Sequence, residues 1–226
     1  MSVAPERPEV VIFDFDGTIA DTMPFLVDLA AGLLHRRYGM PYEEARRAYI
    51  ETTGLPFCRQ IEIILPGNPL NGETVRLFED AKVRHMEEFA FFPDAPGVIR
   101  QMRSQGLKIC LSSGNNEALI RKVLESRGLG VDLVLGYRPG FEKGPQHFET
   151  AAEHFGAPRE KIVFVGDSVR DGLAARKAGI RFIAKAGLVG EEELRERLPD
   201  APVVRSLTEV LPLLGIIIAR EKSGTT

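Results

Sequence analysis

The sequence predicts an α/β protein: a Rossmann-like parallel sheet with helices on both faces, and a helical cap subdomain inserted after the first strand. Two observations predict it. Short apolar segments alternate with amphipathic helical segments along most of the chain, and one long helical stretch interrupts the alternation. Strands covered on both faces form near-continuous apolar runs. Because crossover helices join parallel strands, this alternation favours a parallel sheet.

Apolar runs of strand length are followed by helical patterns that end at glycine. The expected strands are Val10–Phe15, Leu107–Leu111, Val131–Leu135, Lys161–Val165 and Ile180–Ala184. The expected helices are Gly97–Gln105, Glu117–Arg127, Gln146–Phe155 and Arg170–Ala178. Gly106, Gly128, Gly156 and Gly179 stand where left-handed C-terminal caps are expected.

Residues 24–92 break the alternation, because they contain helical patterns and no convincing strand. Tyr42–Ile50 and Thr74–Ala90 are helical, and Thr52–Gln60 ("TTGLPFCRQ") contains a flexible Gly-Pro break. We expect residues 24–92 to form a helical cap domain, and residues 1–23 and 93–226 to form the core. The alternative is a set of extra helices packed on a single domain.

The composition indicates which kinds of partner the protein binds. The net charge is −3, without a long basic tract, which argues against nucleic acid and anionic membrane. Cys58 and Cys110 have neither metal-site spacing nor a disulfide framework, and "MSVAPERPEV" lacks the apolar segment of a signal peptide. We expect a cytoplasmic protein that acts on a small molecule, as a monomer or weak homodimer.

Polar residues follow the predicted strands, and the carboxyl ends of parallel strands meet at one edge of a sheet. Taken singly, each of them could cap a turn or helix, or be solvated. Together, like charges ~4 Å apart repel by about 4 kcal/mol at an effective dielectric near 20. Such a cluster needs a cation, and hard oxygen ligands suit Mg²⁺. The residues are Asp14, Asp16, Ser112–Asn116, Lys143, Asp167 and Asp171.

These motifs resemble those of the haloacid dehalogenase superfamily of phosphotransferases. "DFDGT" at 14–18, a serine after the second strand, a lysine about thirty residues further on and "GDSVRD" at 166–171 occur in that order. The resemblance covers Val10 to Ala184, and the helical-cap branch of the phosphoglycolate phosphatases is nearest in pattern. The lysine motif departs from that branch, because "EKGPQHF" has Gly144 where proline is more usual.

The resemblance implies a role for each motif. Asp14 would be the nucleophile that becomes an aspartyl phosphate, and Asp16 the acid that protonates the leaving group and then activates water. Ser112 and the adjoining Ser113–Gly114 would hold phosphoryl oxygens. Lys143 would neutralise the phosphate and the nucleophile.

The resemblance also implies a Mg²⁺ site. Asp14, the main-chain carbonyl of Asp16, and Asp167 would hold the ion, and Asp171 would lie in the second shell or bind through water.

Substrate specificity is expected in the cap. Thr53, Arg59 and Gln60 of the Gly-Pro break are the candidates, and Arg59 would contact a substrate carboxylate or second phosphate unless it is an exposed helix residue. His147 is expected on the surface of a helix.

Other activities of the superfamily fit less well. Its dehalogenases and phosphonoacetaldehyde hydrolases lack a counterpart of Asp16. β-Phosphoglucomutase keeps both aspartates but has a cap histidine where this chain has Leu26, and His35 lies nine residues further on. The sequence therefore favours a phosphate-ester hydrolase. A phosphomutase is the alternative, and a non-catalytic binding module is the second.

Overall fold

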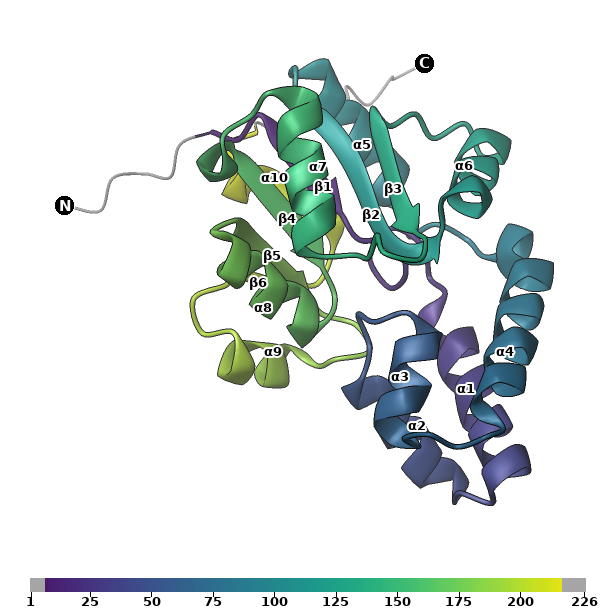
Figure 1. Cartoon of the computed structure of the whole chain (residues 1–226). Coiled ribbons are helices and arrows are strands. Elements are labelled where there is room, and N and C mark those ends of the chain that lie inside the picture. Colours follow the sequence, from purple (N-terminus) through teal and green to yellow (C-terminus); the bar gives the residue numbers. More distant parts are fainter. Residues whose placement is uncertain (1–6, 217–226) are drawn as a thin grey trace, which may run out of the picture.

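The computed structural model describes residues 7–216. Within this range one six-stranded parallel sheet has the order β3-β2-β1-β4-β5-β6 (Figure 1). Because the strand order reverses beside β1, the loops after β1 and β4 diverge and leave a crevice at the carboxyl edge of the sheet. The strands are β1 (Val10–Phe13), β2 (Lys108–Asn116), β3 (Leu133–Tyr137), β4 (Ile162–Gly166), β5 (Arg181–Lys185) and β6 (Val203–Val204).

Helices cover both faces of the sheet, as expected. Val11 and Phe13 pack with α5, α6 and α10, whereas Val10 and Ile12 pack with α7, α8 and α9 on the other face. Successive side chains of one strand therefore supply two separate cores. The helices are α5 (Ala95–Ser104), α6 (Glu117–Ser126), α7 (Pro145–Phe155), α8 (Val169–Ala178), α9 (Glu191–Arg197) and α10 (Val210–Leu213). Gly106, Gly128, Gly156 and Gly179 have positive φ angles at or just after helix ends, as predicted.

Two parts of the core differ from the prediction. The five expected strands are present within one or two residues at most ends, but β2 continues to Asn116 through residues expected to form a loop. Its pairing with β3 shifts register between Ser112 and Asn116, so a bulge lies beside the crevice. The sixth strand, α9 and α10 were not predicted, because segments this short have too little periodicity.

Four helices between β1 and α5 form a cluster of their own at the carboxyl edge of the sheet (Figure 1). They surround an apolar centre that includes Leu34, Tyr49, Phe57 and Phe78. They are α1 (Met23–Tyr38), α2 (Tyr42–Glu51), α3 (Phe57–Ile64) and α4 (Asn71–His85), followed by the short helix η1 (Met86–Glu88). The expectation of an irregular break over Thr52–Gln60 is partly wrong, since Phe57 already begins α3 and is buried in this centre.

The described helices include none that is both long and apolar enough to cross a membrane. Both cysteines are free thiols, as expected. Burial raises the pKa of the Cys110 thiol above its usual value, so it behaves as a core residue.

Candidate active site

A tight turn after β1 carries Asp14 and Asp16. Gly17 has a φ of 73°, and a Cβ there would lie 2.0 Å from Oδ2 of Asp167, so only glycine permits this close approach. Lys185, at the end of β5, is buried and its ammonium donates to the carbonyl of Gly17 at 3.0 Å. The turn is therefore held by a lysine from the end of β5, which belongs to none of the sequence motifs.

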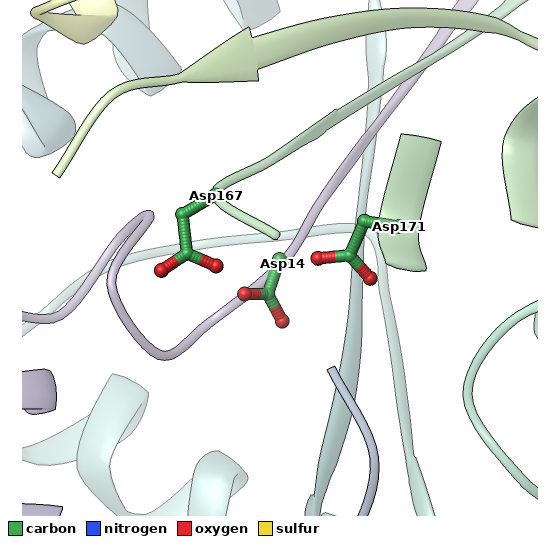
Figure 2. Close-up of side chains that lie close together, drawn as sticks. All are labelled: Asp14, Asp167 and Asp171. Atoms are coloured by element: carbon green, nitrogen blue, oxygen red, sulfur yellow. The ribbon is translucent and has the colours of Figure 1, made fainter. Parts of the chain in front are cut away.

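Three buried aspartates converge at the crevice (Figure 2). Asp14 follows β1, Asp167 follows β4 and Asp171 lies in the first turn of α8. One carboxylate oxygen of each lies within 4.8 Å of the others. The ammonium of Lys143 lies 2.7 Å from Oδ1 of Asp14 and 2.7 Å from Oδ1 of Asp171. Four residues that the sequence predicted to meet are thus in one cluster.

The charges in this cluster are not balanced. Burial, and then the neighbouring carboxylates, raise the pKa of Asp14 well above its usual value, against the opposing effect of Lys143. Burial and Asp171 raise the pKa of Asp167 to about 7. Burial lowers the pKa of Lys143, but Asp14 and Asp171 outweigh it, so the net direction is upward. One lysine cannot compensate three carboxylates, and this set of hard oxygen donors fits Mg²⁺.

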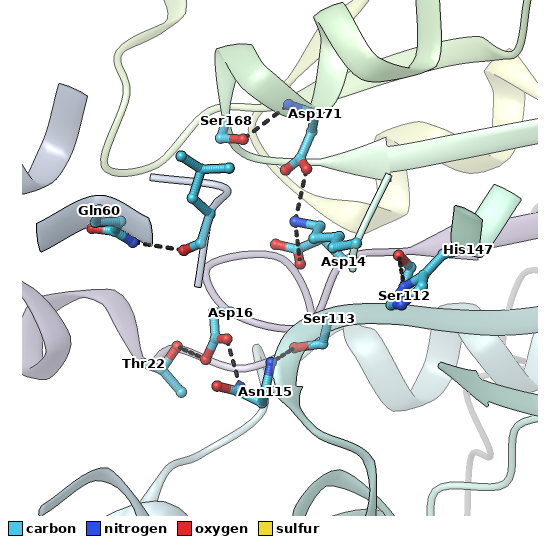
Figure 3. A network of polar contacts seen from close by, with 12 residues as sticks. Asp14, Asp16, Thr22, Gln60, Ser112, Ser113, Asn115, His147, Ser168 and Asp171 are labelled. Atoms are coloured by element: carbon cyan, nitrogen blue, oxygen red, sulfur yellow. Dashed lines mark hydrogen bonds and ion pairs between the residues drawn. The ribbon is translucent and has the colours of Figure 1, made fainter. Parts of the chain in front are cut away.

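The carboxylate of Asp16 is held separately from the cluster (Figure 3). The hydroxyl of Thr22 donates to its Oδ1 at 2.7 Å, and the amide of Asn115 donates to its Oδ2 at 2.6 Å. Asn116, the next residue, caps α6 by accepting from the main-chain N–H of Ala118. Of the two neighbouring asparagines, either of which could cap the helix by its place in the sequence, the second does so and the first donates to Asp16.

The three residues expected to hold phosphate, Ser112–Gly114, differ in what they contact. Ser112 is fully buried, and its Oγ is hydrogen-bonded to Nδ1 of His147 at 2.9 Å (Figure 3). The Oγ of Ser113 accepts the main-chain N–H of Asn115 at 3.1 Å. Gly114 lines the cavity described below, whereas Ser112 and Ser113 do not.

The expectation that His147 lies on a helix surface is wrong, because its exposed fraction is 0%. It lies on the face of α7 that packs on the sheet, next to Phe148. Burial, then the charge of Lys143, lowers its pKa to about 3, so the ring is neutral.

A cavity of about 60 Å³ lies between the sheet edge and the helical cluster. The sheet side contributes Asp14, Asp16, Gly114, Asn115, Lys143 and Asp167. The helical side contributes Met23, Leu26, Tyr49, Thr53–Phe57, Gln60, Phe78 and Lys82. Asp14, Asp16 and the helical cluster therefore face one small space.

The cap candidates differ in where they lie. Thr53 and Gln60 line the cavity, but Gln60 uses its amide N–H on the carbonyl of Leu55 at 2.7 Å. Arg59 is outside the residues that line the cavity, and its exposed guanidinium is paired with Glu142 at 2.9 Å. Lys82 lines the cavity and was not predicted, because a lysine in an amphipathic helix gives no indication of being buried.

Comparison with known proteins identifies the class. The model of the haloacid dehalogenase-like hydrolase family matches residues 11–185, and the chain belongs to this family. The predicted resemblance and the Rossmann-like fold are thereby confirmed, and the chain is an enzyme of a hydrolase family.

The relatives it matches are named as phosphatases. The chain is 29% identical to a probable phosphatase, IndB, of Dickeya dadantii over 89% of this chain and 91% of that one. It is 25% identical to a phosphoglycolate phosphatase of Nitrosococcus oceani over 93% and 98% of the two chains. A putative phosphoglycolate phosphatase structure from Lactobacillus delbrueckii has the same fold, with a TM-score of 0.77 at 19% identity over 95% and 100% of the chains.

Proposed function

We propose that this hydrolase is a Mg²⁺-dependent phosphomonoesterase that releases phosphate from a small phosphorylated metabolite through an aspartyl phosphate on Asp14. The observation that carries the proposal is the ion pair of 2.7 Å between Asp14 and Lys143, in a cavity that Asp16 also lines. Relatives named as phosphatases support it.

The residues divide the chemistry between two steps. The carboxylate of Asp14 attacks phosphorus, the bond from phosphorus to the leaving oxygen breaks, and Asp16 gives that oxygen a proton. Asp16 then takes a proton from a water molecule that attacks the phosphoryl group, which frees Asp14 and releases phosphate. Lys143 keeps positive charge beside the nucleophile throughout, and Gly114, which lines the cavity, would offer its main-chain N–H to a phosphoryl oxygen.

Asp14, Asp167 and the main-chain carbonyl of Asp16 would hold Mg²⁺, with Asp171 directly or through water. When bound, the ion supplies positive charge that offsets the phosphoryl oxygens and the clustered carboxylates.

We also infer that residues 24–92 act as a cap domain on a core of residues 1–23 and 93–226. The separate apolar centre of α1–α4 and the cavity shared with the sheet edge support this division. Thr53 and Gln60 would shape the cap side of the cavity. Arg59, which does not line the cavity, would affect substrate specificity only through its ion pair with Glu142. A cytoplasmic, monomeric or weakly dimeric enzyme remains the expectation from composition.

A phosphomutase is less well supported. Leu26 lines the cavity at the position that a mutase of this family fills with histidine, and His35 bonds the carbonyl of Met40 at 2.8 Å instead of lining the cavity.

Trapping tests the proposal directly. The purified full chain is incubated with acetyl phosphate and Mg²⁺ and reduced with borohydride, which converts an aspartyl phosphate to homoserine. Peptide mass analysis should find homoserine at position 14 in the wild type and none in Asp14→Asn. Phosphate release at an undiminished rate by Asp14→Asn would overturn the covalent mechanism.

A further inference from the structure

We propose that Lys185 is a positioning residue for the proposed acid: it fixes the turn that carries Asp16 at the point where two segments join the core to the cap. This inference rests on the proposed phosphatase function and adds to it a residue outside the sequence motifs. Lys185 does not line the cavity, so it acts on Asp16 through the turn and not by touching the substrate.

The position of Lys185 is unusual for a lysine. It is 3% exposed and ends β5, whose preceding three residues are apolar and buried. Burial lowers the pKa of its ammonium, and the carboxylates of Asp167, Asp94 and Asp21 oppose this shift. Among the described residues, none of these carboxylates forms an ion pair with it. Because a buried ammonium without an ion pair is costly, an apolar side chain would be less costly here unless the contacts of the lysine have a function.

The ammonium of Lys185 contacts both segments that join the core to the cap. It donates to the carbonyl of Gly17 at 3.0 Å and lies 3.5 Å from the ring centroid of Phe92. Gly17 belongs to the turn that leads from β1 toward α1, and Phe92 to the segment that leads from η1 back to α5. A neutral donor could bond the carbonyl, but only a cation is also attracted to the face of the ring.

The two segments are also hydrogen-bonded to each other beside Lys185. The main-chain N–H of Phe92 donates to the carbonyl of Ile19 at 2.9 Å, and Ala20 forms a β-bridge with Phe91. Lys185 therefore holds the core end of a two-stranded connection. A shift of either strand at this end would move the turn with it.

This contact bears more on Asp16 than on Asp14. The main-chain N–H of Asp14 donates to the carbonyl of Val165 at 2.9 Å, and its carboxylate is paired with Lys143, so the sheet edge holds it directly. Asp16 immediately precedes the residue whose carbonyl the lysine holds. A general acid loses efficiency when its orientation toward the leaving oxygen changes. Loss of Lys185 should therefore impair protonation of the leaving group and largely spare the nucleophile.

The test compares kcat for two esters in the full chain with Mg²⁺, using Lys185→Met, which removes the ammonium and keeps an apolar side chain. An alkyl phosphate such as 2-hydroxyethyl phosphate needs a proton on its leaving oxygen, whereas p-nitrophenolate leaves without one. We expect kcat to fall about 10- to 100-fold for the alkyl phosphate and at most about threefold for p-nitrophenyl phosphate. KM should change little for both, because Lys185 is outside the residues that line the cavity.

Phe92→Leu tests the same junction without removing the lysine, and it serves if Lys185→Met proves unfolded by circular dichroism. It removes the ring beside the ammonium and should produce a smaller loss with the same selectivity. Lys108→Met is the matched control, because Lys108 is an exposed strand lysine that begins β2, at the opposite end from the crevice. It should keep the wild-type ratio of the two kcat values.

A loss in folded Lys185→Met that is equal for the two esters or larger for p-nitrophenyl phosphate, or no loss for either, would overturn the positioning role while the phosphatase function stands. The same outcomes decide the matter in Phe92→Leu if that is the variant that folds. A wild type that hydrolyses activated esters but no alkyl phosphate would overturn the acid role of Asp16 and this inference. Absence of hydrolysis of any ester, acetyl phosphate included, would overturn the proposed function as well.

Discussion

The side-chain amide of Asn115 donates a hydrogen bond of 2.6 Å to Oδ2 of Asp16, a residue 99 positions earlier in the chain. Asp16 is the proposed acid, and its other oxygen accepts the hydroxyl of Thr22 at 2.7 Å. A proton donor must keep a narrow orientation toward the leaving oxygen to be effective. The bulged end of β2 therefore positions the proposed acid, which belongs to the turn after β1.

Asn115→Ala should lower kcat for an alkyl phosphate such as 2-hydroxyethyl phosphate by about 10- to 100-fold. The loss for p-nitrophenyl phosphate should be smaller, since p-nitrophenolate leaves without a proton. Asp16→Asn should show the same selectivity more strongly. Asn116→Ala is the matched control: loss of its cap should lower the free energy of unfolding by about 1 kcal/mol with little kinetic effect. Equal losses on both substrates in Asn115→Ala would contradict this role.

Asp14→Asn should reduce kcat by roughly 10³-fold or more, because the amide keeps the volume of the side chain and removes the nucleophile. Steady-state phosphate release measures the loss, and circular dichroism verifies the fold. Asp28→Asn, on an exposed carboxylate of α1 that is paired with Arg46, should retain wild-type activity. Activity of Asp14→Asn within tenfold of the wild type would exclude a nucleophilic role.

Chelation with EDTA should abolish activity, Mg²⁺ should restore it, and Ca²⁺ should restore it poorly because its larger, more flexible shell misplaces the phosphoryl group. Asp167→Asn should raise the Mg²⁺ concentration for half-maximal activity by at least about tenfold, since even outer-shell partners contribute 10- to 100-fold to metal affinity. Metal titrations of activity measure both effects. Full activity in excess chelator would refute the metal site.

His147 should make the protein less stable in mild acid. Its folded pKa is about 3 and its unfolded pKa about 6.5, so below pH 6.5 the unfolded chain binds a proton that the folded chain does not. Stability therefore falls as the pH falls through this window, by up to about 1.4 kcal/mol per pH unit, and is unaffected by this group at higher pH.

Denaturant unfolding at pH 7.5 and 5.0 tests that prediction. Between these values the wild type should lose about 2 kcal/mol more than His147→Leu. His154→Leu removes an exposed histidine of the same helix and should behave as the wild type does. Identical pH dependence in the wild type and His147→Leu would show that the buried ring does not resist protonation.

Much of the core could be predicted, because a strand that is buried on both faces is a continuous run of apolar residues in the sequence. The central strand Val10–Phe13 is fully buried, and a run of that kind has few alternatives to a covered strand. The strand β6 could not be predicted, because two residues carry no periodicity and their place depends on pairing with β5.

The sequence by itself determined that Asp14, Lys143, Asp167 and Asp171 would meet, because parallel strands bring their carboxyl ends to one edge whatever the details of packing. Only the tertiary structure decided which other polar groups lie at the site and which side chains they contact. His147 and Lys82 stand on helices that the sequence predicted, whereas Asn115 lies on the part of β2 that was expected to be a loop. Apolar periodicity reports only which face of an element is buried. Whether a polar residue on that face meets Asp16, Ser112 or the cavity depends on how one element is rotated against another, and that rotation follows from packing between residues distant in the chain.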